Sequence, residues 1–517
     1  MSNLRKILIS SLAVAAFSLP AAAKEGGNSP QLDPALAAGW KAHFICSGMF
    51  NAGQELAEIE RNELDGIYPD YDRDYRKLPD AVIDAATKTV SVAYSDAMPP
   101  RMSVWRAGFG CTQMPIGATK DMASFLPTFS TWPAFGGTDR GSAIGSDVMV
   151  RLRTDDTERL EAPVSFAFDE RTYGNGTRTS AVLVVKDGQV VAEQYARGIE
   201  HETPQRTWSV AKSITATILG AARRNGHIDL NYPAVIEDFN SGADPRRKIT
   251  LTNLMHMASG LDSGEIGSRT DRIYFGGGRV IDQAADNVLE AAPGTRFKYA
   301  NNDTLIAMRS FRESIASDEA YHRFPYEHLL HKIGANRTTM EIDWNGDFIS
   351  SSQVWSTARD LARIGQLYLQ DGMWGNERLL PEGWAEFVRT PAPAQPASGG
   401  QGYGAQFWLL NDTPGVPEDT FLMAGNRGQY VVISPSLNAV VVRRGYDVNG
   451  GARFKIDEFA RDVLGALQAS QDARLAIEVE NAAIEAEIEA TIEAERARSQ
   501  RSRDKIRARI MSRYGRE

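Results

Sequence analysis

The alternation of apolar and polar positions predicts two β-hairpins far apart in the chain. The first begins near Thr179, where "TSAVLVVKDGQVVAEQYARG" places two apolar runs around the dipeptide Asp187-Gly188, which is typical of tight hairpin turns. The second is "QYVVISPSLNAVVVRRG", with strands expected over 430–433 and 439–443 on either side of a Pro- and Asn-containing turn.

The region between the hairpins has a helical period. A helix is expected to begin near residue 209 and to end at Gly226, and another is expected over about 454–467. Strands therefore come first, helices fill the middle, and strands with a helix come last. This order predicts an α+β domain whose antiparallel sheet joins both ends of the segment, with a helical insertion. The apolar residues at helical spacing in the first helix are Ala211, Ile214, Ile218 and Ala222.

The composition changes sharply at about residue 470. The segment 470–517 is rich in Ala, Glu and Arg, with an acidic first half and a basic second half, an order that suits the helix macrodipole. Two interpretations stay open: a helix that self-associates or docks on a partner, and a solvated single helix. A thin apolar stripe is short and uneven and does not decide between them; its members are Ile477, Ile484, Ile488 and Ile492.

The N-terminal residues have the organisation of a secretory signal peptide. Arg5 and Lys6 precede an apolar run over 7–19, and the small residues 21–23 suit a signal peptidase. We expect cleavage after Ala23 and a periplasmic or secreted protein with no stable membrane span. A membrane anchor or a buried helix is the alternative, and the short apolar run argues against it.

The next region, 24–165, contains both cysteines of the chain. Export would place Cys46 and Cys111 in an oxidising compartment, where such a pair is expected to form a disulfide; two buried thiols are the alternative. The only clear strand signal there is "TVSVAY" at 89–94. The chain therefore divides into a signal peptide (1–23), an N-terminal region (24–165), a main domain (166–469) and a charged helical tail (470–517).

Overall composition excludes some classes of function. The chain is 42% hydrophobic and 24% charged with a net charge of −9, so it lacks the basic balance of a nucleic-acid-binding protein. No G-x-S-x-G nucleophile elbow, H-E-x-x-H zinc motif or phosphate-binding G-x-x-x-x-G-K-[ST] is present. We therefore expect neither a metal nor a cofactor.

The segment "WSVAKS" is the first candidate for catalysis. Residues three apart share a helix face, so Ser209 and Lys212 would point the same way and the lysine could remove the serine proton. This requires burial to lower the lysine pKa from its usual value. The same S-x-x-K spacing recurs at Ser502 and Lys505, in a charged segment where nothing would lower that pKa.

Two later segments supply companions for this pair. In "APGTRFKYANND", Tyr299 could relay a proton, and Asn301 could orient the lysine and a substrate carbonyl. In "MAGNRGQYVV", Gly428 would let a substrate lie close to a strand. The backbone N–H of Gln429 could then join that of Ser209 as an oxyanion hole.

In order and spacing, these motifs resemble the serine β-lactamase/penicillin-binding protein superfamily, and more narrowly its class C β-lactamase-like branch with esterases and 6-aminohexanoate-dimer hydrolases. The resemblance covers roughly residues 179–467. It implies a β-lactamase/transpeptidase-like α+β fold and an acyl-enzyme mechanism. In that mechanism Ser209 would be the nucleophile, Lys212 would assist its deprotonation, Tyr299 would be general base and relay, and Asn301 would orient the substrate.

One triplet departs from the superfamily's pattern. Asn426-Arg427-Gly428 stands where penicillin-recognising members carry Lys-Thr-Gly or His-x-Gly, so the substrate-facing position is the neutral Asn426. Strand alternation would turn Arg427 to the opposite face. We therefore expect a hydrolase of a small ester or linear amide. The alternative is a catalytically silent, penicillin-binding-like protein that binds a cell-envelope component.

Overall fold

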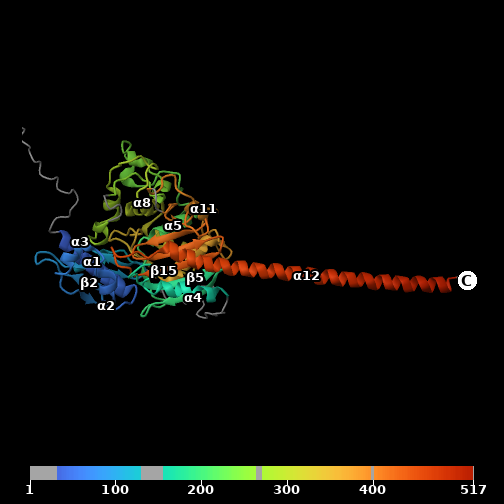
Figure 1. Cartoon of the computed structure of the whole chain (residues 1–517). Coiled ribbons are helices and arrows are strands. Elements are labelled where there is room, and N and C mark those ends of the chain that lie inside the picture. The colour runs from blue at the N-terminus through green and yellow to red at the C-terminus, as the bar shows by residue number, and fades with distance from the viewer. Residues whose placement is uncertain (1–31, 130–154, 264–269, 398–400, 516–517) are drawn as a thin grey trace, which may run out of the picture.

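A six-stranded antiparallel sheet lies at the centre of the computed structural model, which describes residues 32–129, 155–263, 270–397 and 401–515 (Figure 1). Its strand order is β12-β13-β14-β15-β5-β6, so the two ends of the main domain meet where β15 pairs with β5. The expected α+β fold is confirmed. The strands are β5 (Thr179–Lys186), β6 (Gln189–Tyr195), β12 (Trp408–Leu409), β13 (Phe421–Gly425), β14 (Gln429–Ser434) and β15 (Ala439–Gly445).

Both faces of this sheet are buried, which explains the continuous apolar run of β5. Leu183 and Val185 enter the main core, while Val182 and Val184 enter a second core on the opposite face. The first hairpin turn lies at the expected Asp187-Gly188. Both residues have positive φ (51° and 74°), as in the turns that match the twist of paired strands.

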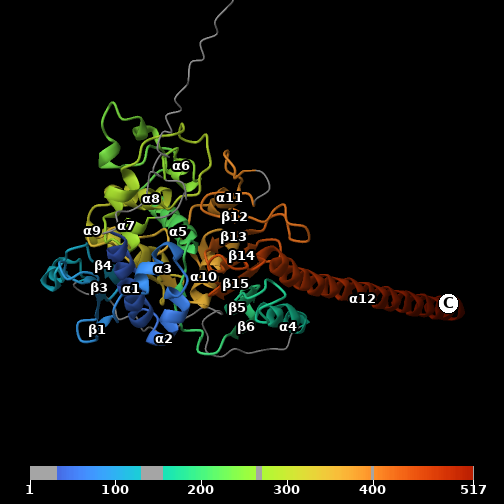
Figure 2. The ribbon, with the colours of Figure 1, turned by 60° about the vertical axis from the view of Figure 1, so that its left-hand side comes forward.

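Helices cover the two faces of the sheet (Figure 2). α5 (Val210–Arg224) and α10 (Ala358–Leu369) pack on one face, and α4 (Asp155–Ala167) packs on the other with the first turns of α12 (Ile456–Tyr514). α4 spans the junction expected between residues 165 and 166. It packs against β5 and β6 of the main domain. α5 stops just before Gly226, whose φ is +78°, as expected.

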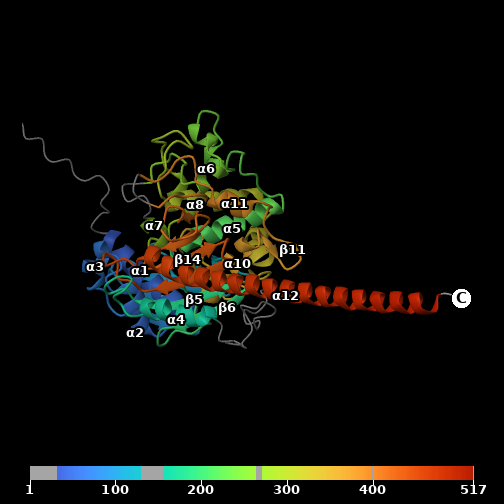
Figure 3. The ribbon, with the colours of Figure 1, turned by 45° about the vertical axis from the view of Figure 1, so that its right-hand side comes forward.

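A helical region lies beyond α5, away from the sheet (Figure 3). Within it α8 contacts both α5 and α6, so it holds this region onto the sheet domain. Its helices are α6 (Leu251–Met255), α7 (Asp271–Tyr274), α8 (Asn301–Ser314), α9 (Asp318–Pro325) and α11 (Trp384–Arg389). The small sheets are β7 (Gln205–Arg206) with β9 (Val354–Ser356) and β8 (Thr339–Met340), and β10 (Met373–Trp374) with β11 (Glu377–Arg378). The 3-10 and π-helical turns are Glu60–Leu64, Lys120–Phe125, Glu237–Phe239, Pro245–Lys248, Ile281–Ala285 and Tyr326–Leu330.

The N-terminal region, which we call the N-terminal block (residues 32–129), has its own sheet and shares the main core of the sheet domain. Its α1 (Leu32–Phe50) packs across a four-stranded sheet. The expected strand at 89–94 is β2, and the rest of the block had no periodic signal. α1 in particular is buried on all sides over 35–48, so it lacks the polar face that marks an amphipathic helix. The other elements are α2 (Leu56–Ile59), α3 (Pro69–Tyr75), β1 (Val82–Asp84), β2 (Thr89–Val92), β3 (Arg101–Arg106) and β4 (Gly110–Gln113).

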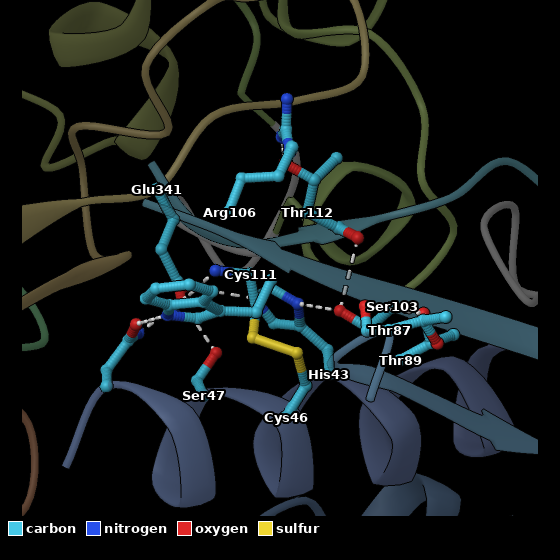
Figure 4. The surroundings of a disulfide bond; sticks show 12 residues. His43, Cys46, Ser47, Thr87, Thr89, Ser103, Arg106, Cys111, Thr112 and Glu341 are labelled. Atoms are coloured by element: carbon cyan, nitrogen blue, oxygen red, sulfur yellow. Dashed lines mark hydrogen bonds and ion pairs between the residues drawn. A yellow bond between two sulfur atoms is a disulfide. The ribbon is translucent and has the colours of Figure 1, made fainter. Parts of the chain in front are cut away.

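A disulfide joins Cys46 of α1 to Cys111 of β4, as expected (Figure 4). Beside it, the buried carboxylate of Glu341, from the main domain, accepts hydrogen bonds from the Ser47 hydroxyl (2.6 Å) and the Cys111 backbone N–H (3.2 Å). The Nε2 atom of His43 lies 3.1 Å from the same carboxylate. Glu341 therefore fastens the N-terminal block to the main domain.

The C-terminal helix is one continuous element. The sequence suggested a helix over 454–467 followed by a separate tail, but α12 runs unbroken from Ile456 to Tyr514. Its first turns bury Phe459 and Val463 in the second core, and Arg474 reaches back to Asp156 of α4 (3.0 Å). Beyond that contact the helix projects from the body as a single rod (Figure 1).

The expected signal peptide and its cleavage site lie outside the described residues. Among the helices of the described ranges, none combines the length and the apolar character needed to cross a bilayer.

The disulfide generates a stability prediction. Replacing both cysteines (Cys46→Ser with Cys111→Ser) should lower the free energy of unfolding by up to about 4 kcal/mol, because the bond closes a long loop with a sequence separation of 65. Urea denaturation without reductant measures this. Dithiothreitol should lower the free energy of unfolding of the parent protein to that of the variant and leave that of the variant unchanged. Equal stability of the two oxidised proteins would contradict the prediction.

Candidate active site

Ser209 stands at the start of α5, where a strained residue precedes it. Trp208 has a φ of +51°, a conformation that bulky side chains rarely adopt and that persists only when the surroundings impose it. The surroundings here are aromatic and cationic: the buried guanidinium of Arg206 lies 4.0 Å from the Trp208 ring and 4.0 Å from that of Phe44. This stack fixes the backbone that presents the serine.

Lys212 lies one turn after Ser209, with its amine buried in a set of acceptors. Its Nζ lies 2.9 Å from Ser209 Oγ, 2.7 Å from Asn301 Oδ1 and 2.9 Å from the carbonyl oxygen of Ser351. Burial lowers the pKa of Lys212 to about 7, because the charged ammonium is poorly solvated there. A large fraction of this amine is therefore neutral near pH 7 and can take a proton from the serine.

Tyr299 completes the arrangement around the serine. It lines the same cavity as Ser209, and its ring centre lies 5.0 Å from Lys212 Nζ. Burial raises the pKa of Tyr299 well above its usual value, so the phenol keeps its proton at neutral pH. The general-base and relay role that the resemblance implied for Tyr299 stays a prediction.

Sequence reasoning missed Ser351 and Tyr274. Ser351 holds Lys212 through its backbone carbonyl, an acceptor that every residue type supplies, so no sequence pattern marks it. Its hydroxyl lies 2.6 Å from the hydroxyl of Tyr274, which faces the same cavity. The run "SSS" at 350–352 was the only available signal.

The segment carrying Asn426 is a turn, which corrects the strand-alternation argument for Arg427. Gly425 pairs directly with Gln429, so residues 426–428 form the connection between β13 and β14. Arg427 has a φ of +58° and is buried, with its guanidinium hydrogen-bonded to the Asp447 carbonyl (2.9 Å). Its guanidinium is therefore engaged by the segment after β15, although Arg427 is among the residues that line the cavity.

The expected oxyanion donor also changes. Gln429 is buried, its side chain bonds Arg444 (2.7 Å), and it is not among the residues that line the cavity. Gly425 instead approaches the serine: a methyl group added there would lie 3.1 Å from the Ser209 nitrogen. The next residue after Gly425 is Asn426, which is exposed and lines the cavity. Its backbone N–H is therefore the candidate second oxyanion donor.

Gly428 is required for a different reason from the one expected. Its φ is +80°, and an added side chain would overlap Arg443 and Asp447. Close packing of Arg443, whose Nη1 donates to the Gly428 carbonyl (2.9 Å), therefore explains this glycine better than room for a substrate.

Ser209, Tyr299, Asn301 and Asn426 line a cavity of about 1,090 Å³. Its walls come from the main domain, from Tyr68 of the N-terminal block and from the segment 447–458 that leads into α12. Such a volume suits a small organic substrate. Among the described residues, no group of three His, Cys, Asp or Glu side chains is placed to hold a metal ion.

Comparison with known proteins shows which family this chain belongs to. Residues 166–444, more than half of the chain, match the family described as Beta-lactamase. The chain belongs to the Beta-lactamase family. This confirms the resemblance that the motifs indicated.

Relatives of this Beta-lactamase family member include hydrolases. A 6-aminohexanoate-dimer hydrolase of Paenarthrobacter ureafaciens is 26% identical over 310 residues, which cover 55% of this chain and 77% of the relative. A Bacillus anthracis structure assigned as a 6-aminohexanoate-dimer hydrolase has a TM-score of 0.50 and 22% identity, covering 60% of this chain and 82% of the other. A family VIII carboxylesterase has a TM-score of 0.48 and 13% identity, with coverages of 61% and 98%.

The second S-x-x-K of this Beta-lactamase family chain has none of these surroundings. Ser502 and Lys505 lie on the projecting part of α12, where both side chains are exposed. A second Y-x-N sequence, "YGN" at 173–175, does not contribute to the site. Its Tyr173 is buried in the second core and donates a hydrogen bond to Asp462 (2.9 Å). Burial beside acceptors, rather than spacing, distinguishes Lys212.

The pKa of Lys212 predicts how the reactivity of Ser209 depends on pH. Labelling by a fluorophosphonate should speed up as the pH rises through about 7, where the amine loses its proton and becomes a base. Asn301→Asp would place a carboxylate beside Nζ and raise the lysine pKa, so the midpoint should move up by about one pH unit or more. Asn301→Leu, which adds no charge, is the matched control. An unchanged or lower midpoint in Asn301→Asp would contradict this assignment.

Proposed function

We propose that this protein is an exported serine hydrolase that cleaves a small ester or amide through an acyl-serine intermediate. The contact between the Lys212 amine and Ser209 Oγ (2.9 Å), in a site that lowers the lysine pKa to about 7, is the observation that carries the proposal. A silent binding protein has no need of a buried lysine whose charged form is disfavoured.

The reaction follows from the positions of these groups. The neutral Lys212 amine takes the proton of Ser209 as Oγ attacks the substrate carbonyl carbon. The negative charge that forms on the carbonyl oxygen is stabilised by the backbone N–H of Ser209 and, in our revised assignment, that of Asn426. The proton then passes through the Tyr299 hydroxyl to the leaving alcohol or amine as its bond to carbon breaks.

Water completes the cycle. It attacks the acyl-serine carbonyl carbon and releases the acid product, and its proton returns through the same groups to Ser209 Oγ. The amide of Asn301 keeps Lys212 oriented in both half-reactions, because its oxygen stays 2.7 Å from Nζ.

The turn next to the serine supports a linear ester or amide as substrate. Asn426 is neutral, and Arg427 directs its charge toward Asp447 and the N-terminal block, so this turn offers no cation for a carboxylate placed as in penicillins. Besides Arg427, the basic residues that line the cavity are Arg453 and Lys455, from the segment that leads into α12. The 6-aminohexanoate-dimer hydrolase relative is consistent with a linear amide.

Export is part of the proposal. The signal-like N-terminus and the disulfide between Cys46 and Cys111 support it, because disulfides persist in oxidising compartments. N-terminal sequencing of the protein from a fractionated cell envelope should give Lys24 as the first residue, and recovery of the uncleaved chain in the cytosol would contradict export.

Catalytic variants test the mechanism. Ser209→Ala should abolish both fluorophosphonate labelling and hydrolysis of a p-nitrophenyl ester, while Lys212→Ala and Tyr299→Phe should lower kcat/KM by about a hundredfold or more. Ser502→Ala, in the exposed copy of the motif, is the matched control and should behave like the parent protein. Full activity of Ser209→Ala would exclude the proposed nucleophile. Stoichiometric labelling without turnover would instead identify the protein as a silent binder.

Substrate preference gives a separate prediction. The parent protein should hydrolyse a short p-nitrophenyl ester with a kcat/KM at least about tenfold above that for a chromogenic cephalosporin, because the turn lacks a cation for the cephalosporin carboxylate. A linear amide of 6-aminohexanoate belongs in the same comparison. Faster turnover of the cephalosporin would contradict the assignment drawn from Asn426.

A further inference from the structure

The projecting part of α12 carries an exposed apolar stripe. All six isoleucines after residue 470 lie on one side of the helix, within about 80° of its circumference at 100° per residue. Each is between 43% and 57% exposed, so the body of the protein covers none of them. They are Ile477, Ile484, Ile488, Ile492, Ile506 and Ile510.

Charge divides the same rod into two halves. Residues 478–495 contain seven glutamates and no Lys or Arg, whereas residues 496–513 contain eight basic residues and a single acid, Asp504. The change of sign falls next to Ser499, which lies on the isoleucine side of the helix at the midpoint between Ile492 and Ile506.

From this pattern we propose that two copies of the protein associate through an antiparallel pair of α12 helices, with a two-fold axis at Ser499. Reversing the helix about Ser499 brings apolar residues onto apolar residues. The facing positions are Ile492 with Ile506, Ile488 with Ile510, and Ile484 with Tyr514.

The same reversal lays the acidic half of one helix along the basic half of the other. Opposite charges across a helix pair set its orientation and register. Two pairs lie at the same height and within about 40° of the Ser499 direction at 100° per residue: Glu495 with Arg503, and Glu485 with Arg513. In a parallel pair each glutamate would face its own copy, so charge repulsion excludes that orientation as the preferred one.

The geometry of the chain leaves room for this assembly. The rod leaves the body after Arg474, which pairs with Asp156, and the helix pair would begin at Ile484. The ten steps from Arg474 to Ile484 span about 15 Å at 1.5 Å per residue, so Tyr514 of one helix stops short of the body of the other copy. The overlap from 484 to 514 spans about 45 Å. A two-fold contact of this kind is closed and yields a dimer.

Sedimentation of the full mature chain over a range of concentrations tests the proposal first. We expect a reversible equilibrium between monomer and dimer, and a chain that ends at Leu475 should remain a monomer with unchanged ester hydrolysis. A full chain that stays monomeric at about 100 µM, above the dissociation constant that a pair of this length should have, would overturn the proposal. So would a dimer that survives the truncation.

Charge exchange tests the register. One variant carries Glu485→Arg and Glu495→Arg, and the other carries Arg503→Glu and Arg513→Glu. Each alone should raise the dissociation constant of the dimer at least about tenfold, because like charges then face each other. An equimolar mixture should restore a mixed dimer, since each new charge meets its complement. Dimers of undiminished affinity in the separate variants, or no recovery on mixing, would overturn the register.

Crosslinking tests the orientation, since both native cysteines are already joined to each other. Ser499→Cys should form a disulfide between copies. Ile488→Cys mixed with Ile510→Cys should form one only in the antiparallel arrangement, and Ile488→Cys alone should form one only in a parallel arrangement. Rapid crosslinking of Ile488→Cys with itself would overturn the proposal.

Discussion

The burial of one amine organises the site. Lys212 brings its Nζ to acceptors from three separate segments: Ser209 at the start of α5, Asn301 at the start of α8, and the carbonyl of Ser351. Burial at the junction of these segments lowers the pKa of Lys212 to about 7, because an ammonium is poorly solvated there. The sheet, the helical region and the segment before β9 must therefore be assembled before the serine has its base.

The sequence allowed the prediction of those parts of the molecule whose signals are local. The turn at Asp187-Gly188, the hairpin of β14 and β15, and the Ser209–Lys212 pair on α5 all follow from residues close together in the chain. The turn over 426–428 did not, because a glycine-containing turn and the first residues of a strand look alike in sequence. The contributions of Ser351 and Tyr274 arise only when distant segments fold together.

The N-terminal block contributes directly to the active site. Its Tyr68 lines the cavity, and the backbone carbonyl of Asn62 accepts a hydrogen bond from Arg427, in the turn that carries Asn426. The buried carboxylate of Glu63 lies 3.7 Å from the same guanidinium. These contacts explain why Arg427 is unavailable to a substrate: its charge is used to hold the two parts of the chain together.

The stack of Phe44, Arg206 and Trp208 connects the block to the nucleophile itself. Phe44 comes from α1, and Trp208 is the left-handed residue whose backbone presents Ser209. A change in α1 could therefore act on the serine without touching any catalytic side chain, because the block supplies one face of the support behind Trp208.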